Sequence, residues 1–144
     1  GWLQVAQKLS GNQGKVMGID LSFVEEIPDT NIIQADIENL DVVDDIMSYF
    51  GKKIDSLICD LSPQVSGNWS VDHATQISLN YSAVKIMEQV LDKKGNALFK
   101  VFDGEYSAEF FDFMKTKFIK TKRTKPKASR KPSSELYCIC MGYL

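Results

Sequence analysis

Apolar residues recur along the chain in two alternating patterns, one typical of amphipathic helices and one typical of short buried strands. The helical spacing predicts helices over residues 2–9, 40–50, 77–91 and 110–118. Short apolar runs predict strands over residues 16–19, 32–33, 57–59, 97–102, 119–124 and 136–141. The pattern therefore indicates a chain in which helices and strands alternate.

Alternating strands and helices favour right-handed crossovers and a mainly parallel sheet that is covered on both faces. The last two strands, 119–124 and 136–141, are joined by a segment without a helix, so we expect antiparallel neighbours at one edge. The fold class predicted is α/β, with a doubly wound sheet and a terminal antiparallel hairpin. A length of 144 residues fits a single domain over residues 1–144.

Charge is distributed unevenly along the chain. The net charge of -2 conceals that residues 1–114 carry 8 Lys+Arg against 18 Asp+Glu, whereas residues 115–144 carry 9 against Glu135 alone. The nine basic residues form one basic segment: Lys115, Lys117, Lys120, Lys122, Arg123, Lys125, Lys127, Arg130 and Lys131. Such a cluster is typical of a surface that binds nucleic acid or another polyanion, although a solvated linker has the same composition. Because a predicted strand follows directly, we expect these charges to be held in a fixed place.

The sequence shows no sign of a membrane or of an oxidising compartment. No apolar run approaches the roughly 20 residues that cross a bilayer, and the amino terminus does not resemble a secretory signal. The three cysteines, Cys59, Cys138 and Cys140, lie in apolar runs without a C-x-x-C motif, which favours core side chains over disulfides or zinc ligands. An intracellular, cytoplasmic protein is expected.

Three successive strand regions each end in an aspartate: Asp20, Asp36 and Asp60. Because ligands of open parallel sheets bind outside the carboxyl ends of the strands, we expect the three carboxylates to line one crevice. Asp20 follows Gly1 by 19 residues, a spacing typical of an acid that binds nucleotide ribose hydroxyls. The alternative is that each aspartate caps a helix or turn.

Lys100 interrupts the apolar strand 97–102, where a central strand should be apolar on both faces. Burial favours a neutral amine that can take a proton, whereas a neighbouring carboxylate would hold the ammonium form in place. The other reading is a lysine whose stem packs on the core while its head reaches water. Glu135 is the only acid in the last thirty residues and directly precedes the final strand.

Two aromatic or titratable residues follow the third strand region. His73 is expected in the first turn of a helix, and without Cys or His partners nearby it gives no metal site. Trp69 lies in the polar stretch 66–70, where it either stacks on a nucleic-acid base or pins the loop to the core.

Several of these residues belong to motifs that resemble the FtsJ/RrmJ family over essentially the whole chain. The motifs are Gly1-Trp2, Gly18-Ile19-Asp20-Leu21, Asp36, Cys59-Asp60-Leu61-Ser62-Pro63, Lys100-Val101-Phe102-Asp103-Gly104-Glu105, and the stretch from Ser129 to Tyr137. The resemblance implies a Rossmann-like methyltransferase sheet and S-adenosylmethionine-dependent methylation of a ribose 2′-hydroxyl. The implied substrate is large-subunit ribosomal RNA, free or within the ribosomal subunit, and most often one of its uridines.

The resemblance also assigns roles to individual residues. Three members of the family's catalytic Lys-Asp-Lys-Glu tetrad match as Asp60, Lys100 and Glu135, with Lys100 activating the hydroxyl and the two acids orienting it. Cofactor binding is implied for Gly1, Trp2, Asp20, Asp36 and Asp60. The basic segment would face the RNA backbone.

The family's first strand and first tetrad lysine have no counterpart in residues 1–144, so we expect the sequence to be an incomplete piece of the domain. Two other functions remain open at this point. A nicotinamide-dependent oxidoreductase would also use an acid such as Asp20 at a ribose. An RNA-binding module with a degenerate active site would keep the basic segment and lose the chemistry.

Overall fold

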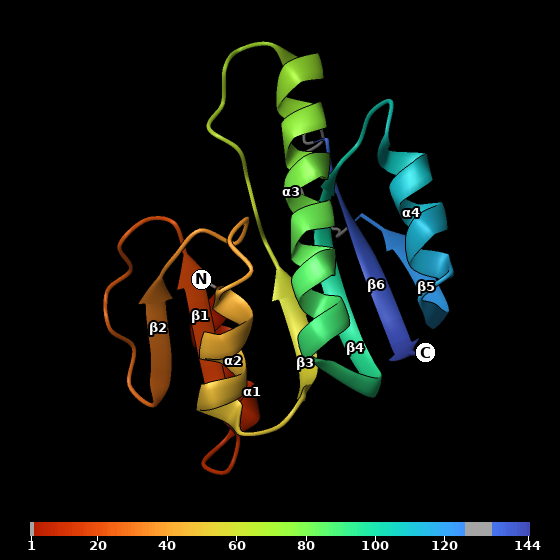
Figure 1. The fold of residues 1–144 in the computed structure, drawn as a ribbon. Coiled ribbons are helices and arrows are strands. Elements are labelled where there is room, and N and C mark those ends of the chain that lie inside the picture. Colours follow the sequence, from red (N-terminus) through yellow and green to blue (C-terminus); the bar gives the residue numbers. More distant parts are fainter. Residues whose placement is uncertain (1, 126–133) are drawn as a thin grey trace. The chain divides into compact units, whose positions relative to one another are not determined.

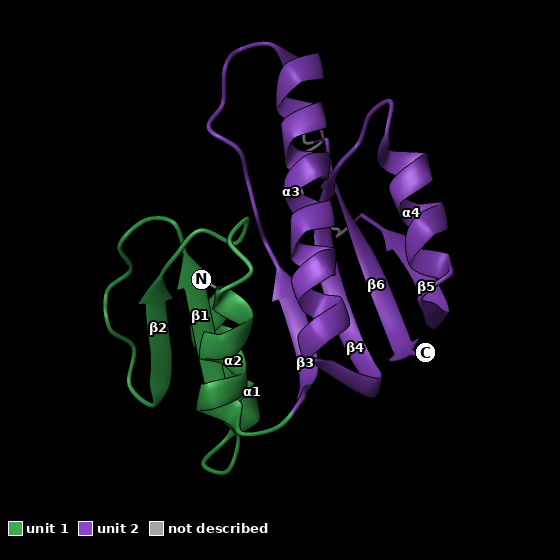
Figure 2. Ribbon diagram, in the orientation of Figure 1, with its two compact units in different colours: residues 1–52 green, residues 53–144 purple. Residues whose placement is uncertain are grey.

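The structure, a computed structural model, describes residues 2–125 and 134–144 and divides into two compact units. Unit 1 comprises residues 1–52 and unit 2 comprises residues 53–144, and Figure 2 colours them green and purple. The prediction of one domain over residues 1–144 stays a prediction.

Unit 1 pairs two parallel strands with two helices. Its elements are α1 (Trp2–Ser10), β1 (Val16–Asp20), β2 (Thr30–Gln34) and α2 (Val42–Phe50). The strands run in register from Val16 opposite Thr30 to Asp20 opposite Gln34. Gly18 allows α1 to approach β1 closely, because a Cβ at this position would lie 2.6 Å from a methyl carbon of Leu3. The parallel strands end side by side, so Asp20, the last residue of β1, and Asp36, two residues after β2, follow neighbouring strands.

Unit 2 is a four-stranded mixed sheet with two helices. Its elements are β3 (Ile54–Cys59), α3 (Trp69–Val90), β4 (Leu91–Phe102), α4 (Ser107–Lys115), β5 (Phe118–Thr124) and β6 (Glu135–Tyr143). The strand order is β3-β4-β6-β5, in which β3 and β4 are parallel and β6 is antiparallel to both of its neighbours. The carboxyl ends of β3 and β4 therefore meet at one edge of the sheet.

The core of unit 2 lies between this sheet and both helices, which cover the same face (Figure 1). Phe99 and Val101 of β4 are fully buried there, and Phe99 packs edge-on against Phe110 of α4 with ring centroids 5.7 Å apart. Cys138 and Cys140 are also fully buried, as free thiols whose sulfurs are 3.5 Å apart. The prediction that these cysteines are core side chains on one face is confirmed.

The α/β class and the terminal antiparallel hairpin are confirmed, while three details differ from the sequence pattern. The strand expected over 97–102 begins six residues earlier, at Leu91. Among the described strands, two pairings are parallel and two are antiparallel, because β6 lies between β4 and β5. The helix expected over 77–91 already begins at Trp69, where the Asn68 side chain accepts a hydrogen bond from the Val71 amide at 3.4 Å. Its first turns bury polar side chains, so hydrophobic periodicity does not mark them.

Within the described ranges, none of the helices is both long and apolar enough to cross a membrane.

Candidate active site

Lys100 and Asp60 meet at the edge where β3 and β4 end. Cys59 is the last residue of β3 and pairs with Phe99 of β4, which places Asp60 beside Lys100. The Nζ of Lys100 lies 3.1 Å from Oδ1 of Asp60. Lys100 is only 8% exposed, whereas the Asp60 side chain is 44% exposed. The buried amine of Lys100 thus has a carboxylate partner that is open to solvent, and a ligand can approach the pair from that side.

The β6 strand adds two more polar groups to the face that carries Lys100. Tyr137 lies directly opposite Lys100 in the antiparallel ladder, and Glu135 lies opposite Phe102. Paired residues of antiparallel strands project to the same face, as do residues two apart on one strand. Lys100, Glu135 and Tyr137 therefore share one face. The three tetrad matches, Asp60, Lys100 and Glu135, therefore lie at one end of the sheet, where β3 and β4 end and β6 begins.

Tyr137 was part of a sequence motif but had no predicted role. Burial, followed by the negative charges of Glu135 and Asp60, raises the pKa of its phenol above the ordinary value. The phenol therefore stays protonated through the neutral range and can donate a hydrogen bond. Its place opposite Lys100 in the ladder puts Tyr137 among the groups of the candidate site.

Cys59 lies beside the pair but is not a nucleophile. Burial is the main reason that the pKa of its thiol is raised to about 12. Nucleophilic cysteines need the opposite shift, because the thiolate is the reactive form. Cys59 is thus a neutral core side chain, as its apolar surroundings in the sequence predicted.

Two buried amides of α3 fix the backbone around Lys100, and sequence reasoning missed both. Gln76 donates from Nε2 to the carbonyl of Lys100 at 2.7 Å, and its Oε1 accepts the amide of Phe102 at 3.0 Å. Asn80 donates to the same Lys100 carbonyl at 2.8 Å. The Gln76 amide thereby satisfies the backbone groups of β4 that a neighbouring strand would otherwise pair, because β3 has already ended at Cys59. These hydrogen bonds hold the backbone of Lys100 in the extended conformation beyond the end of β3.

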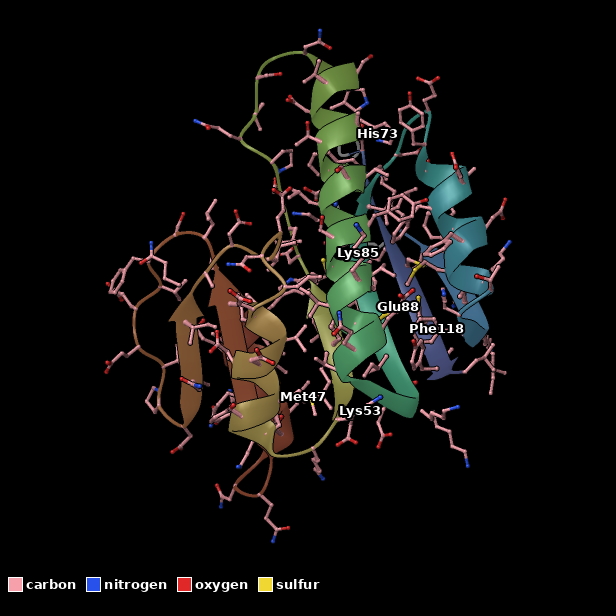
Figure 3. The ribbon with its side chains drawn as sticks, in the orientation of Figure 1. Met47, Lys53, His73, Lys85, Glu88 and Phe118 are labelled. Atoms are coloured by element: carbon pink, nitrogen blue, oxygen red, sulfur yellow. The ribbon has the colours of Figure 1, made fainter. Side chains whose placement is uncertain are left out.

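The basic segment does not form a uniform surface in the described residues. Lys115 pairs with Asp112 at 3.5 Å, and Lys117 pairs with Glu88 at 3.1 Å. Glu88 and Phe118, both labelled in Figure 3, lie in this part of unit 2. These two lysines are thus engaged with unit 2 itself. Lys125 is exposed, and Lys127, Arg130 and Lys131 lie outside the described residues.

Arg123 is also engaged within unit 2. Its guanidinium lies 3.1 Å from Oδ1 of Asp103 and 5.1 Å from the ring centroid of Phe111 in α4. Asp103 also accepts a hydrogen bond from Ser107 at 3.1 Å. Arg123 therefore anchors the turn that follows β4, on the helix-covered side of the sheet.

Lys120 and Lys122 lie on the opposite side, the face of the sheet that carries Lys100. Lys122 pairs across β6 with Ile139, which pairs with Leu98 of β4, two residues from Lys100. Both lysines are exposed. Among the described residues of the basic segment, this pair therefore shares a face with the candidate site.

Replacing Lys120 and Lys122 together by alanine is expected to weaken RNA binding and to reduce the slope of log affinity against log salt by about two, because each phosphate contact contributes roughly one unit. The slope is measured by titrating RNA at several salt concentrations. Lys93→Ala serves as the control, since Lys93 is an exposed lysine in the amino-terminal part of β4. An unchanged slope in the double variant would show that this pair makes no phosphate contact.

In unit 1, Asp20 and Asp36 lie at the ends of neighbouring strands. Asp20 accepts a hydrogen bond from the Ser22 amide at 2.9 Å, and Asp36 accepts one from the Glu38 amide at 2.9 Å. Both carboxylates are exposed, so each closes a turn and remains open to a ligand such as ribose hydroxyls. That they share a crevice with Asp60 stays a prediction. Trp2 begins α1, and Gly1 lies outside the described residues.

His73 and Trp69 both belong to α3. His73 is buried, and its Nε2 accepts a hydrogen bond from the Tyr106 amide at 2.9 Å. In the part of the chain that the structure describes, no group of three or more His, Cys, Asp or Glu residues is placed to hold a metal ion. Trp69 is the first residue of the helix and stacks on Phe102 with ring centroids 5.3 Å apart.

Comparisons with known proteins show a family match over nearly the whole chain. The family model described as FtsJ-like methyltransferase matches residues 1–143. A ribosomal RNA large subunit methyltransferase E of Nitrosopumilus maritimus is 67% identical over 144 residues, which are 100% of this chain and 73% of that protein. The protein of the same name from Cenarchaeum symbiosum is 56% identical over 142 residues, covering 99% of this chain and 72% of its own length.

A solved structure is similar as well. The crystal structure of a ribosomal RNA methyltransferase from Plasmodium falciparum superposes with a TM-score of 0.86 at 28% identity. The match covers 99% of this chain and 80% of that one.

Proposed function

The chain belongs to the FtsJ-like methyltransferase family, and we propose that it transfers the methyl group of S-adenosylmethionine to a ribose 2′-hydroxyl of ribosomal RNA. The observation that carries this proposal is the buried Lys100 paired at 3.1 Å with Asp60 at the end of β4. The alternative of a nicotinamide oxidoreductase leaves Lys100, Glu135 and the basic segment without a shared role. The names of the relatives extend the proposal to large-subunit ribosomal RNA as substrate. A cytoplasmic site of action and a uridine target belong to the same proposal.

The cofactor fits the residues present in unit 1. Asp20 and Asp36 place two exposed carboxylates at adjacent strand ends, and carboxylates of this kind accept hydrogen bonds from ribose hydroxyls and adenine amino groups. S-adenosylmethionine, when bound, supplies a methyl carbon made electrophilic by its positively charged sulfur. The remaining work falls to the protein side chains, which orient the ribose and take up its proton.

Proton removal is assigned to Lys100. The hydroxyl proton would move to Nζ of Lys100 in its neutral amine form as the ribose oxygen takes the methyl group, and the electrons of the methyl–sulfur bond would stay with the cofactor. Asp60 holds Nζ in place from the solvent side, while Glu135 and the protonated phenol of Tyr137 face the same space. Alignment of the hydroxyl and proton removal are the two contributions that such residues can make.

Asp20→Asn is expected to weaken S-adenosylmethionine binding by about tenfold, because the neutral amide is a poorer acceptor for ribose hydroxyls than the carboxylate. Calorimetric titration of the full-length protein measures the affinity. Asp41→Asn removes an equally exposed carboxylate of unit 1 and should leave the affinity unchanged. Binding of a nicotinamide dinucleotide without binding of S-adenosylmethionine would contradict the proposed cofactor.

The activity itself is tested by methyl transfer from labelled S-adenosylmethionine to isolated large-subunit ribosomal RNA and to large ribosomal subunits. We expect label to enter RNA in at least one of the two substrates. Tight RNA binding without any incorporation of label into either substrate would instead identify a binding module.

A further inference from the structure

A continuous series of aromatic rings extends from Lys100 to the surface of unit 2. The Nζ of Lys100 lies 5.8 Å from the ring centroid of Phe102, and Phe102 stacks on Trp69 at 5.3 Å and 22°. Trp69 in turn stacks on His73 at 6.5 Å and 25°, and His73 stacks on Tyr106 at 5.7 Å and 1°. Four nearly parallel rings thus begin beside the proposed catalytic amine.

Buried and exposed rings alternate along this series. Phe102 and His73 are 6% and 2% exposed, whereas Trp69 and Tyr106 are 46% and 43% exposed. Large aromatic side chains are usually buried more completely than this when packing is their only role. Trp69 and Tyr106 together form what we call the aromatic surface.

The aromatic surface is held rigidly from below. The Tyr106 amide donates to Nε2 of His73 at 2.9 Å, and His73 is labelled in Figure 3 in the amino-terminal half of α3. Gly104 allows this approach, because a Cβ there would lie 2.8 Å from three atoms of the imidazole ring. Within the described residues, the buried Nδ1 of His73 has no hydrogen-bond partner.

We propose that Trp69 and Tyr106 stack on an unpaired base of the RNA, next to the nucleotide whose ribose lies at Lys100. The inference rests on the proposed function and names the form of its substrate, a locally single-stranded RNA. Bases that leave a helix stack readily on fixed aromatic rings, and such stacking tolerates any base because each has a π face. The rings are already ordered, so base binding costs little side-chain entropy. The position of Trp69, one ring beyond Phe102, fits a base adjacent to the target.

The test compares two probes of the same length and charge, a single-stranded oligouridylate and an abasic ribose-phosphate chain. Wild-type protein should bind the oligouridylate more tightly. Trp69→Ala and Tyr106→Ala should each weaken oligouridylate binding by about tenfold and leave binding of the abasic chain unchanged. Trp69→Phe keeps a ring and should retain most of the affinity. Phe23→Ala, which removes an exposed ring of unit 1, serves as the control and should have no effect.

A second measurement does not depend on truncating the stack. In a Trp2→Phe background, Trp69 is the only tryptophan of residues 1–144, and its fluorescence should be quenched by the oligouridylate but not by the abasic chain. Equal affinities of wild type and both alanine variants for the oligouridylate, or equal losses for the two probes, would overturn the inference. Failure of the proposed function is a separate result, seen as wild-type protein that binds RNA by stacking and transfers no methyl group.

Discussion

Lys100→Ala is expected to lower the rate of methyl transfer by about 10²–10⁴-fold, the usual contribution of a positioned acid or base. The affinity for RNA should stay nearly constant, because Lys100 is only 8% exposed and its Nζ is engaged by Asp60. Single-turnover kinetics with labelled S-adenosylmethionine gives the rate, and equilibrium titration of RNA gives the affinity. The combination separates a group that acts on the ribose proton from one that binds phosphate.

Two further variants sharpen this result. Lys100→Arg keeps the positive charge beside Asp60 but replaces the amine with a guanidinium that does not give up its proton in proteins, so it should be nearly as inactive as the alanine variant. Lys93→Ala removes an exposed lysine from the same strand and should leave the rate unchanged. A loss of RNA affinity that matches the loss of rate would make Lys100 a phosphate contact and end its assignment as the base.

Gln76→Ala is expected to lower the free energy of unfolding by about 2–4 kcal/mol, because it leaves the buried Phe102 amide without an acceptor and opens a small cavity. The Lys100 carbonyl keeps its bond from Asn80, so the strand should loosen without unfolding. The rate of methyl transfer should fall while the KM for RNA stays constant, since the change acts through the position of Lys100. Denaturant titration and steady-state kinetics measure the two effects.

The same helix offers a matched control for Gln76. Gln89 is exposed near the carboxyl end of α3, so Gln89→Ala removes the same side chain without disturbing a buried bond. It should change neither stability nor rate. A Gln76→Ala variant that is destabilised but has the wild-type rate would show that Gln76 stabilises the fold without positioning Lys100.

Hydrophobic periodicity predicted most of the elements because each helix and strand buries a regular apolar face. It missed the first turns of α3, where the buried face carries Asp72, His73 and Gln76. These residues contact the loops and strand ends around the candidate site. Because they are polar and buried, they interrupt the apolar periodicity by which a helix is recognised in the sequence. The insertion of β6 between β4 and β5 was also hidden, since strand order depends on pairing over long sequence distances.

The candidate site was visible in part. A lysine in a fully apolar strand is costly unless it has a partner, so Lys100 stood out, and the structure supplies Asp60 as the partner. Tyr137 gave no comparable signal, because tyrosine is common in strands and only the register with Lys100 reveals its place. The basic segment was predicted as one surface because all its charges are positive, yet Arg123 and Lys122 project to opposite faces of the sheet.

The central claim is that the acceptor is a ribose 2′-hydroxyl, and alkaline hydrolysis of the methylated RNA tests it most directly. The full-length protein would be incubated with labelled S-adenosylmethionine and large-subunit RNA or ribosomal subunits, and the RNA then hydrolysed in alkali. A methyl group on the 2′-oxygen blocks cleavage at its own linkage, so the label should appear in alkali-resistant dinucleotides. Label in mononucleotides would mean methylation of a base and would contradict the role assigned to Lys100.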